Sequence, residues 1–196
     1  MNYYFLYTNS SNKLWRNFVT FSEDILLEEH SISSLNDIVY NTNGHIYIKA
    51  LIKGKGTLSK SETEFVNIYF PPYTRINEVC MIREDIYKSS PNINIHGGRM
   101  CDINIIGDFR VKYKALIFSN VIDCINWDLS NNDSYPIYTN LVLNDSEIPF
   151  KIDGFFLKNW SPYGRCYSIV NDTLKEYLLS FPEAHHFIMF EKLKTI

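Results

Sequence analysis

Short apolar segments separated by polar breaks fill the chain between Phe109 and Ile196, and this alternation constrains the fold more than any other feature. The β-branched and aromatic content of these segments, and the turn residues between them, are typical of strands. The segments lie at Arg110–Phe118, Val121–Ile125, Leu141–Leu143, Gly154–Leu157, Cys166–Val170 and Phe187–Leu193. Short strands that accompany a single clear helix predict an α+β fold with mixed or antiparallel sheets and a few short helices.

The clear helix begins after Asn171, near the C-terminus. Asn171 is a suitable N-cap, and Asp172 places negative charge in the first turn, where the helix dipole favours it. Pro182 ends the helix. Apolar residues recur at the helical spacing i, i+3, i+4, i+7 at Leu174, Tyr177, Leu178 and Phe181. Burial of each leucine would contribute about 1.5–3 kcal/mol, so we expect this helix to pack on the sheet.

The first half of the chain predicts further strands and only short helices. Strands are expected at Tyr3–Tyr7 and at His45–Ile52, both from their β-branched and aromatic content. Ser22 is interpreted as the N-cap of a short helix, because Glu23 and Asp24 would place negative charge in its first turn.

The domain organisation follows from the most loop-like region, Ser89–Gly98, which comes after a helical turn expected over residues 83–88. We expect a variable N-terminal α+β subdomain over residues 1–107 and a C-terminal α+β subdomain over residues 108–196. One compact domain is the alternative.

Composition excludes several classes of function. The chain has 196 residues and a net charge of -3, which does not fit a strongly basic nucleic-acid-binding protein. No apolar run approaches the roughly 20 residues that a membrane span needs, and the N-terminus predicts a strand instead of a signal peptide. The four cysteines are far apart and form no CxxC pair, which indicates free thiols in a reducing cytoplasm. We therefore expect a cytoplasmic protein without nucleic-acid or membrane partners.

Motifs that could carry catalysis or bind a cofactor are incomplete. Gly54-Lys55-Gly56 lacks the spacing of a phosphate-binding loop, and His96-Gly97-Gly98 has no serine elbow to accompany it. The cysteines adjoin apolar segments, where burial raises the pKa of a thiol and lowers its reactivity. His185 and His186 would face opposite sides of a strand, so they do not suggest a metal site. We predict no catalytic residue, no cofactor and no metal.

Acidic residues are concentrated in two segments that contain no Lys or Arg. The first lies between Arg16 and Lys49 and the second between Lys114 and Lys151. Their acidic residues are Glu23, Asp24, Glu28, Glu29 and Asp37 in the first segment, and Asp123, Asp128, Asp133, Asp145 and Glu147 in the second. Such segments could form a face for a basic partner, which would raise the association rate and the specificity, or they could be two solvated loops.

The second half of the chain resembles a family of bacterial immunity proteins from polymorphic toxin systems. Four features carry the resemblance, in chain order, over residues 109–196. They are the strand into Val121–Ile125, Leu141–Leu143 leading to Ile148–Pro149, Phe155–Leu157 with Trp160, and Ile169–Asn171 opening the helix at Leu174–Leu178. Asn171 stands where the family often carries a capping Ser, and residues 182–185 stand where it is expected to carry a Gly.

The resemblance implies a cytoplasmic α+β protein that binds a cognate toxin as a heterodimer and blocks its active site, without catalysis of its own. Because the matching residues are core and turn residues, they support a shared fold more directly than a shared function. The acidic segments would then form the interface, except for Asp123, which is not among the candidates. Aromatic anchors would come from Tyr135, Tyr138, Trp160 or Tyr163.

Two other functions remain open from the residues alone. An enzyme that acts on a small molecule or reverses a toxin-made modification would need polar groups that converge in a pocket. The cluster that could supply them is His96, Arg99, Cys101 and Asp102. A structural or regulatory module with an unrelated partner is the third interpretation.

Overall fold

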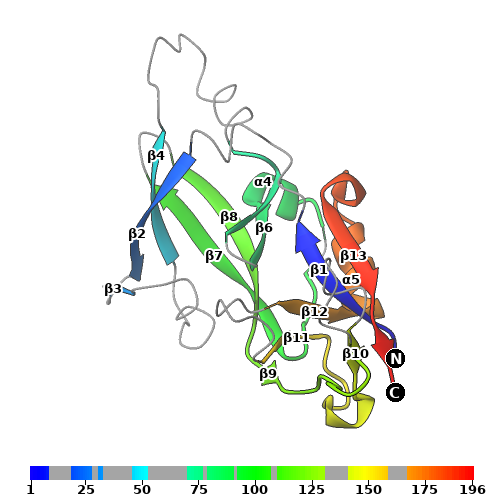
Figure 1. The fold of residues 1–196 in the computed structure, drawn as a ribbon. Helices are drawn as coiled ribbons and strands as arrows, with labels where there is room; N and C mark the ends of the chain where they lie inside the picture. The colour runs from blue at the N-terminus through cyan, green and yellow to red at the C-terminus, as the bar shows by residue number, and fades with distance from the viewer. Residues whose placement is uncertain are drawn as a thin grey trace.

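The computed structural model describes residues 1–8, 19–27, 31–32, 46–52, 70–76, 79–90, 92–106, 110–130, 141–158 and 167–196. Within these residues the fold is α+β, with strands in the majority, as the sequence predicts. Most of the strands belong to two large sheets that lie beside each other (Figure 1).

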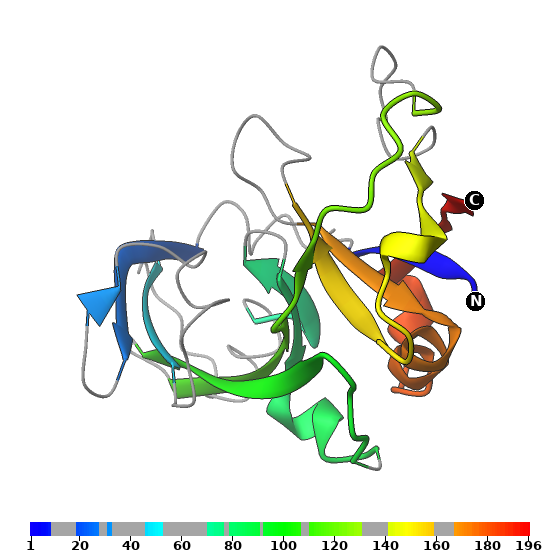
Figure 2. The same ribbon diagram turned by 90° about the horizontal axis from the view of Figure 1, so that it is seen from below.

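The larger sheet has seven strands and curves strongly (Figure 2). Its spatial order is β3 (Ser31–Ile32), β2 (Val19–Leu27), β4 (Ile46–Ile52), β7 (Gly98–Ile106), β8 (Arg110–Phe118), β6 (Val79–Arg83) and β5 (Tyr73–Ile76). Only β4 and β7 are parallel among these neighbours. The short helix α4 (Glu84–Tyr87) follows β6 directly, at the helical turn expected over residues 83–88.

The smaller sheet joins the two ends of the chain. Its order is β13 (Ile188–Lys192), β1 (Tyr3–Thr8), β12 (Ser168–Asn171), β11 (Gly154–Leu157) and β9 (Val121–Ile122). β1 is antiparallel to both of its neighbours, so that Tyr3 lies opposite Asn171 and Tyr4 lies opposite Lys192. A strand from the start of the chain is therefore held between two strands from its end, as Figure 1 shows.

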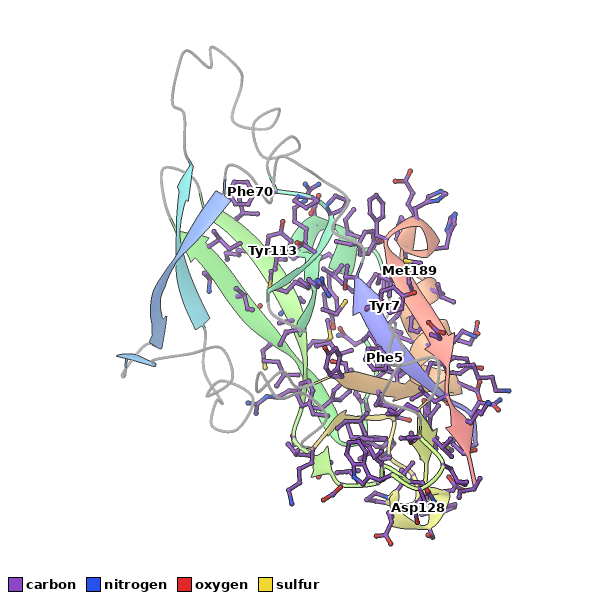
Figure 3. All side chains as sticks on the ribbon, in the orientation of Figure 1. Phe5, Tyr7, Phe70, Tyr113, Asp128 and Met189 are labelled. Atoms are coloured by element: carbon purple, nitrogen blue, oxygen red, sulfur yellow. The ribbon has the colours of Figure 1, made fainter. Side chains whose placement is uncertain are left out.

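The two faces of the five-stranded sheet contact different cores, because successive side chains of a strand point to opposite faces. One face packs against the helix α5 (Asp172–Leu179) and against β5, β6 and β8 of the larger sheet. This core contains Leu6, Phe156, Val170, Ile82, Leu116, Phe118, Leu174 and Leu178. The other face is covered by residues 124–125 and 141–152, around Tyr3, Phe5, Phe155, Leu157 and Ile169. Figure 3 shows Phe5 within the smaller sheet.

The sheets approach closely at Gly154, the first residue of β11. A Cβ atom at this position would overlap the ring of Phe118 on β8. That ring lies edge-to-face against Phe156, with 5.3 Å between the ring centroids. Glycine at position 154 therefore allows the larger sheet to pack directly on the smaller one.

Helix α5 confirms the helix prediction. The Asn171 side-chain oxygen accepts a hydrogen bond of 2.9 Å from the Leu174 backbone N–H, which is the expected N-cap contact. The predicted apolar stripe is buried, and Phe181 stacks on Tyr87 of α4. After the helix, the carbonyl of Pro182 accepts a hydrogen bond from the Tyr73 hydroxyl, so the end of α5 is attached to β5.

The prediction of a short helix after Ser22 is wrong, because residues 19–27 form strand β2. β2 pairs with β4 near both of its ends, with Val19 opposite Ile52 and Leu27 opposite Ile46. The register shifts between Phe21 and Ile25, where the acidic residues lie. Backbone pairing with a neighbouring strand outweighs a local capping preference, which contributes only about 1 kcal/mol.

The two large sheets do not divide between residues 107 and 108, where the sequence predicts the boundary between two subdomains. This position lies between β7 and β8, which pair along their entire length from Gly98 opposite Phe118 to Ile106 opposite Arg110. β1 belongs to the sheet of the C-terminal strands. A separate two-stranded sheet is formed by β10 (Val142–Leu143) and β14 (Lys194–Thr195), which pair in parallel.

Candidate functional site

The structure describes only part of the predicted interface. Asp128, Asp145 and Glu147 are described and exposed. Glu23 and Asp24 belong to strand β2. The other candidates lie outside the described residues: Glu28, Glu29, Asp37, Asp133, Tyr135, Tyr138, Trp160 and Tyr163. Gly54–Gly56 also lies outside them.

The described acidic candidates do not form one face. β2 lies at the far side of the molecule from β10 (Figures 1 and 2). Asp128 is also separated from Asp145. Ile125 and Leu143 form an antiparallel bridge, and the two segments that follow these residues run in opposite directions. Figure 3 labels Asp128 at the opposite end of the molecule from Phe70. These residues therefore belong to separate parts of the described chain, and their role in an interface stays a prediction.

Asp145 and Glu147 instead border an open cavity of about 560 Å³. They belong to the 3₁₀ turn η2 (Asp145–Glu147), which follows β10. The backbone N–H of Asp145 donates to the carbonyl of Ile196, 2.8 Å away, so the turn is attached to the end of the chain. The cavity wall also includes Met1, Tyr3, Phe150 and Lys151.

Tyr3 is one of the two buried members of the cavity wall, together with Ile148. Its side chain is 4% exposed, and its ring lies edge-to-face against Phe155, with 5.9 Å between the centroids. Burial raises the pKa of Tyr3, and the negative charges of Asp145 and of the Cys124 thiolate form raise it further. The hydroxyl therefore stays protonated at neutral pH, and it is not among the buried hydroxyls without a partner in the described chain, which are those of Thr8, Thr74 and Tyr177.

Phe150 is the most exposed large apolar residue of the described chain, at 88%. It lies in the turn before β11, where Lys151 adopts a left-handed backbone conformation with φ of 68°. The Lys151 ammonium group lies 5.6 Å from the centroid of the Phe150 ring, in cation–π contact. Sequence reasoning missed both residues and Tyr3, although an aromatic residue beside Pro149 in a polar turn is a signal that could have identified Phe150.

A buried polar junction immediately follows this turn. The Asp153 carboxylate accepts hydrogen bonds from the His96 backbone N–H at 2.8 Å and from the Asn171 side-chain amide at 2.9 Å. His96 Nδ1 lies 3.1 Å from the same carboxylate. Because Asn171 also caps α5, one carboxylate joins the start of β7, the start of β11 and the helix.

The four residues of the possible enzyme site do not converge. His96 contacts Asp153, whereas Arg99 donates to Cys101 Sγ at 3.1 Å and Asp102 forms an ion pair with Lys114 at 2.6 Å. Asp102 points to the opposite face of β7 from Arg99 and Cys101, because side chains alternate along a strand. Burial raises the pKa of Cys101, although Arg99 partly opposes this.

The other described thiols are buried and free. Burial raises the pKa of Cys80 to about 11, and burial together with Asp123 and Glu147 raises the pKa of Cys124 to about 12. These thiols are protonated at neutral pH, which makes them poor nucleophiles. In the described part of the chain, no group of three or more His, Cys, Asp or Glu is arranged to hold a metal ion.

His185 and His186 do not lie on a strand as expected. They belong to the 3₁₀ turn η3 (Ala184–His186), in which their rings lie 3.8 Å apart between centroids. Glu183 precedes the turn in a left-handed conformation, with φ of 58°, and this redirects the chain between α5 and β13.

Comparisons with known proteins add no relative: no family model, no curated protein and no solved structure matches the chain. Among the described residues, the helices are all too short or too polar to cross a membrane.

Proposed function

We propose that this chain is an immunity protein that binds a cognate bacterial toxin and blocks it by occlusion, without a reaction of its own. The observation that carries the proposal is the exposed Phe150 ring, which stands at an open cavity beside Asp145 and Glu147. Large aromatic side chains and charged neighbours are the elements from which tight protein interfaces are built. The family resemblance supplies the kind of partner.

In this proposal Phe150 inserts into an apolar pocket of the toxin, and the acidic residues attract a basic surface around it. Electrostatic attraction of this kind raises the association rate and lowers it again at high salt. If the toxin acts on nucleic acid, the carboxylates occupy the place of its phosphate substrate. Protection would then take place in the cytoplasm, where a delivered toxin meets its target.

Co-expression tests the proposal. The chain and the product of a neighbouring toxin gene are produced together in a bacterial host, and growth is measured with and without the chain. We expect growth to be restored and a one-to-one complex to be recovered on size exclusion. The variant Phe150→Ala should weaken protection, whereas Met189→Ala, which removes an exposed apolar side chain on β13, should leave it unchanged.

Two results would contradict the proposal. A toxic neighbour that the intact chain neither binds nor inhibits would exclude immunity by occlusion. Protection without a stable complex would favour the enzyme alternative, in which the chain reverses the damage. The variant Cys101→Ser would then reduce protection, which occlusion does not predict.

A further inference from the structure

We propose that the cavity beside η2 receives an arginine side chain of the protein partner. The choice of a protein as the source of this guanidinium group rests on the proposed function. The binding of the group itself rests on the cavity, whose wall combines two acidic residues, a tyrosine and an exposed aromatic ring.

The negative charge of the wall is not neutralised by ion pairs. Neither the Asp145 nor the Glu147 carboxylate lies within ion-pair distance of a basic group in the described chain. Lys151 is the basic side chain that the wall itself contains, and its ammonium group is over the Phe150 ring. Two carboxylates that face an open cavity without partners attract a cation of complementary charge.

The second observation is Tyr3. Its side chain is almost completely buried, yet Tyr3 is part of the cavity wall, and its hydroxyl is not among the buried hydroxyls without a partner in the described chain. A hydroxyl that borders an open cavity is hydrated in the free protein, so a ligand donor that reaches it replaces a hydrogen bond to water. A hydroxyl oxygen accepts such a bond from an N–H group.

The Phe150 ring selects for a delocalised cation. The contact with Lys151 demonstrates that the ring accepts a positive charge, and a planar guanidinium can stack on the ring while its N–H groups reach several acceptors. An ammonium group has fewer donors and is more strongly hydrated. The wall therefore fits arginine better than lysine. In the complex, the guanidinium would displace the Lys151 ammonium group from the ring.

Nuclear magnetic resonance of the isotope-labelled chain tests this binding without any toxin. The probe is Nα-acetyl-arginine amide, and its neutral analogue Nα-acetyl-citrulline amide is the matched control. We expect the arginine probe to shift the signals of Tyr3, Glu147 and Phe150, with a dissociation constant on the order of millimolar. The citrulline probe should leave these signals unchanged, because it has the same shape without the charge.

Three single-charge variants define the site. Glu147→Gln should weaken binding of the arginine probe by about fivefold, as expected for one exposed charge pair. Lys151→Gln should strengthen it, because the competing cation is removed. Asp128→Asn carries the same change of charge as Glu147→Gln but lies away from the cavity, so it should have no effect. An unchanged amide spectrum outside the cavity demonstrates that each variant is folded.

Several results would overturn the inference. Equal binding of the citrulline probe would exclude recognition of charge, and an equal effect of Asp128→Asn would exclude the cavity as its location. Binding of the arginine probe that depends on Glu147, combined with a toxin complex that Glu147→Gln does not weaken, would assign the cavity to a free cationic molecule. Failure of the arginine probe to bind would overturn the inference as well. Growth protection is measured separately, so the two proposals can fail independently.

Discussion

The turn that carries Phe150 and the junction around Asp153 are neighbours in sequence but opposite in environment. Phe150 is 88% exposed and Asp153 is 8% exposed, although only two residues separate them. The Asp153 carboxylate has hydrogen-bond donors on both of its oxygens. At the cavity, by contrast, two carboxylates have no such partners in the described chain.

This difference has a physical consequence for binding. A side chain that must contact a partner loses less conformational entropy on binding when its backbone is already held in place. The junction holds the end of the Phe150 turn against β7, β11 and α5, whereas the turn itself stays open to solvent. The rigid part therefore stabilises the fold, and the open part is available to the partner that we propose.

The largest effect is expected for Phe155→Ala in the core. Phe155 is completely buried against Tyr3, so the substitution leaves a cavity and should lower the free energy of unfolding by about 4 kcal/mol. Urea denaturation followed by circular dichroism measures the change. Phe150→Ala is the matched control on the open side, and it should change stability by less than about 0.5 kcal/mol. A similar loss for both variants would remove the distinction between the two regions.

The second-largest loss of stability is expected at the polar junction around Asp153. Asp153→Ala leaves the His96 N–H without its acceptor, and the Asn171 amide keeps only the Ile152 carbonyl. The substitution should lower the free energy of unfolding by about 3 kcal/mol. The same denaturation experiment applies, with Asp128→Ala as the exposed control. If the Asp153 variant is as stable as the control, the junction does not hold the turn.

The substitution Lys151→Gly is expected to raise the free energy of unfolding, by less than the two preceding substitutions lower it. The left-handed conformation of Lys151 costs a residue with a side chain roughly 1 kcal/mol or more, and glycine avoids this cost but loses more entropy on folding. The free energy of unfolding should therefore rise by about 0.5 kcal/mol. Lys151→Ala removes the same charge but keeps the strain, so a gain of equal size in that variant would attribute the effect to charge.

The smallest effect is expected at the N-terminal segment. Partial burial raises the pKa of Asp172, but hydrogen bonds from Tyr4 and Asn2, together with nearby Lys175, outweigh this and lower the pKa below its ordinary value of 3.8. A carboxyl group with a lowered pKa in the folded state stabilises the protein when it is ionised. This contribution is present above the unfolded-state pKa and is lost as the pH falls through the folded-state pKa.

Denaturation at about pH 7 and at about pH 3 measures this contribution. We expect Asp172→Asn to lower the free energy of unfolding at the higher pH by less than about 0.5 kcal/mol, because the group is largely exposed to solvent. At the lower pH the difference from the natural chain should shrink. A difference that stays constant with pH would show that packing, not charge, is responsible.

Local sequence signals predicted α5 well. Its cap, its apolar stripe and its end depend on residues within one helix length of each other, and all three are present. The strands β1, β4 and β8 were also predicted, because each has a dense run of apolar residues. Strand β7 was missed, since Arg99, Asp102 and Asn104 interrupt the apolar pattern and conceal the alternation of Cys101, Ile103 and Ile105.

The candidate site was predicted only in part. The sequence predicted Asp145 and Glu147 as candidate interface residues, and it grouped them with Asp128 because the three lie in one acidic segment. The antiparallel bridge at Ile125 and Leu143 separates them in space. Proximity along the chain is a poor guide to proximity at a surface when a strand reverses direction between the residues.

By itself, the sequence determined the α+β class, the capped helix and most of the apolar strands, because these depend on composition and on periodicities of a few residues. Tertiary structure decided where the strands lie. Contacts between residues far apart in the chain place β1 between β12 and β13, convert the segment after Ser22 into a strand, and bring Tyr3 to the same cavity as Phe150. Long-range pairing adds free energy that no local pattern contains, and so it decides the geometry of the site.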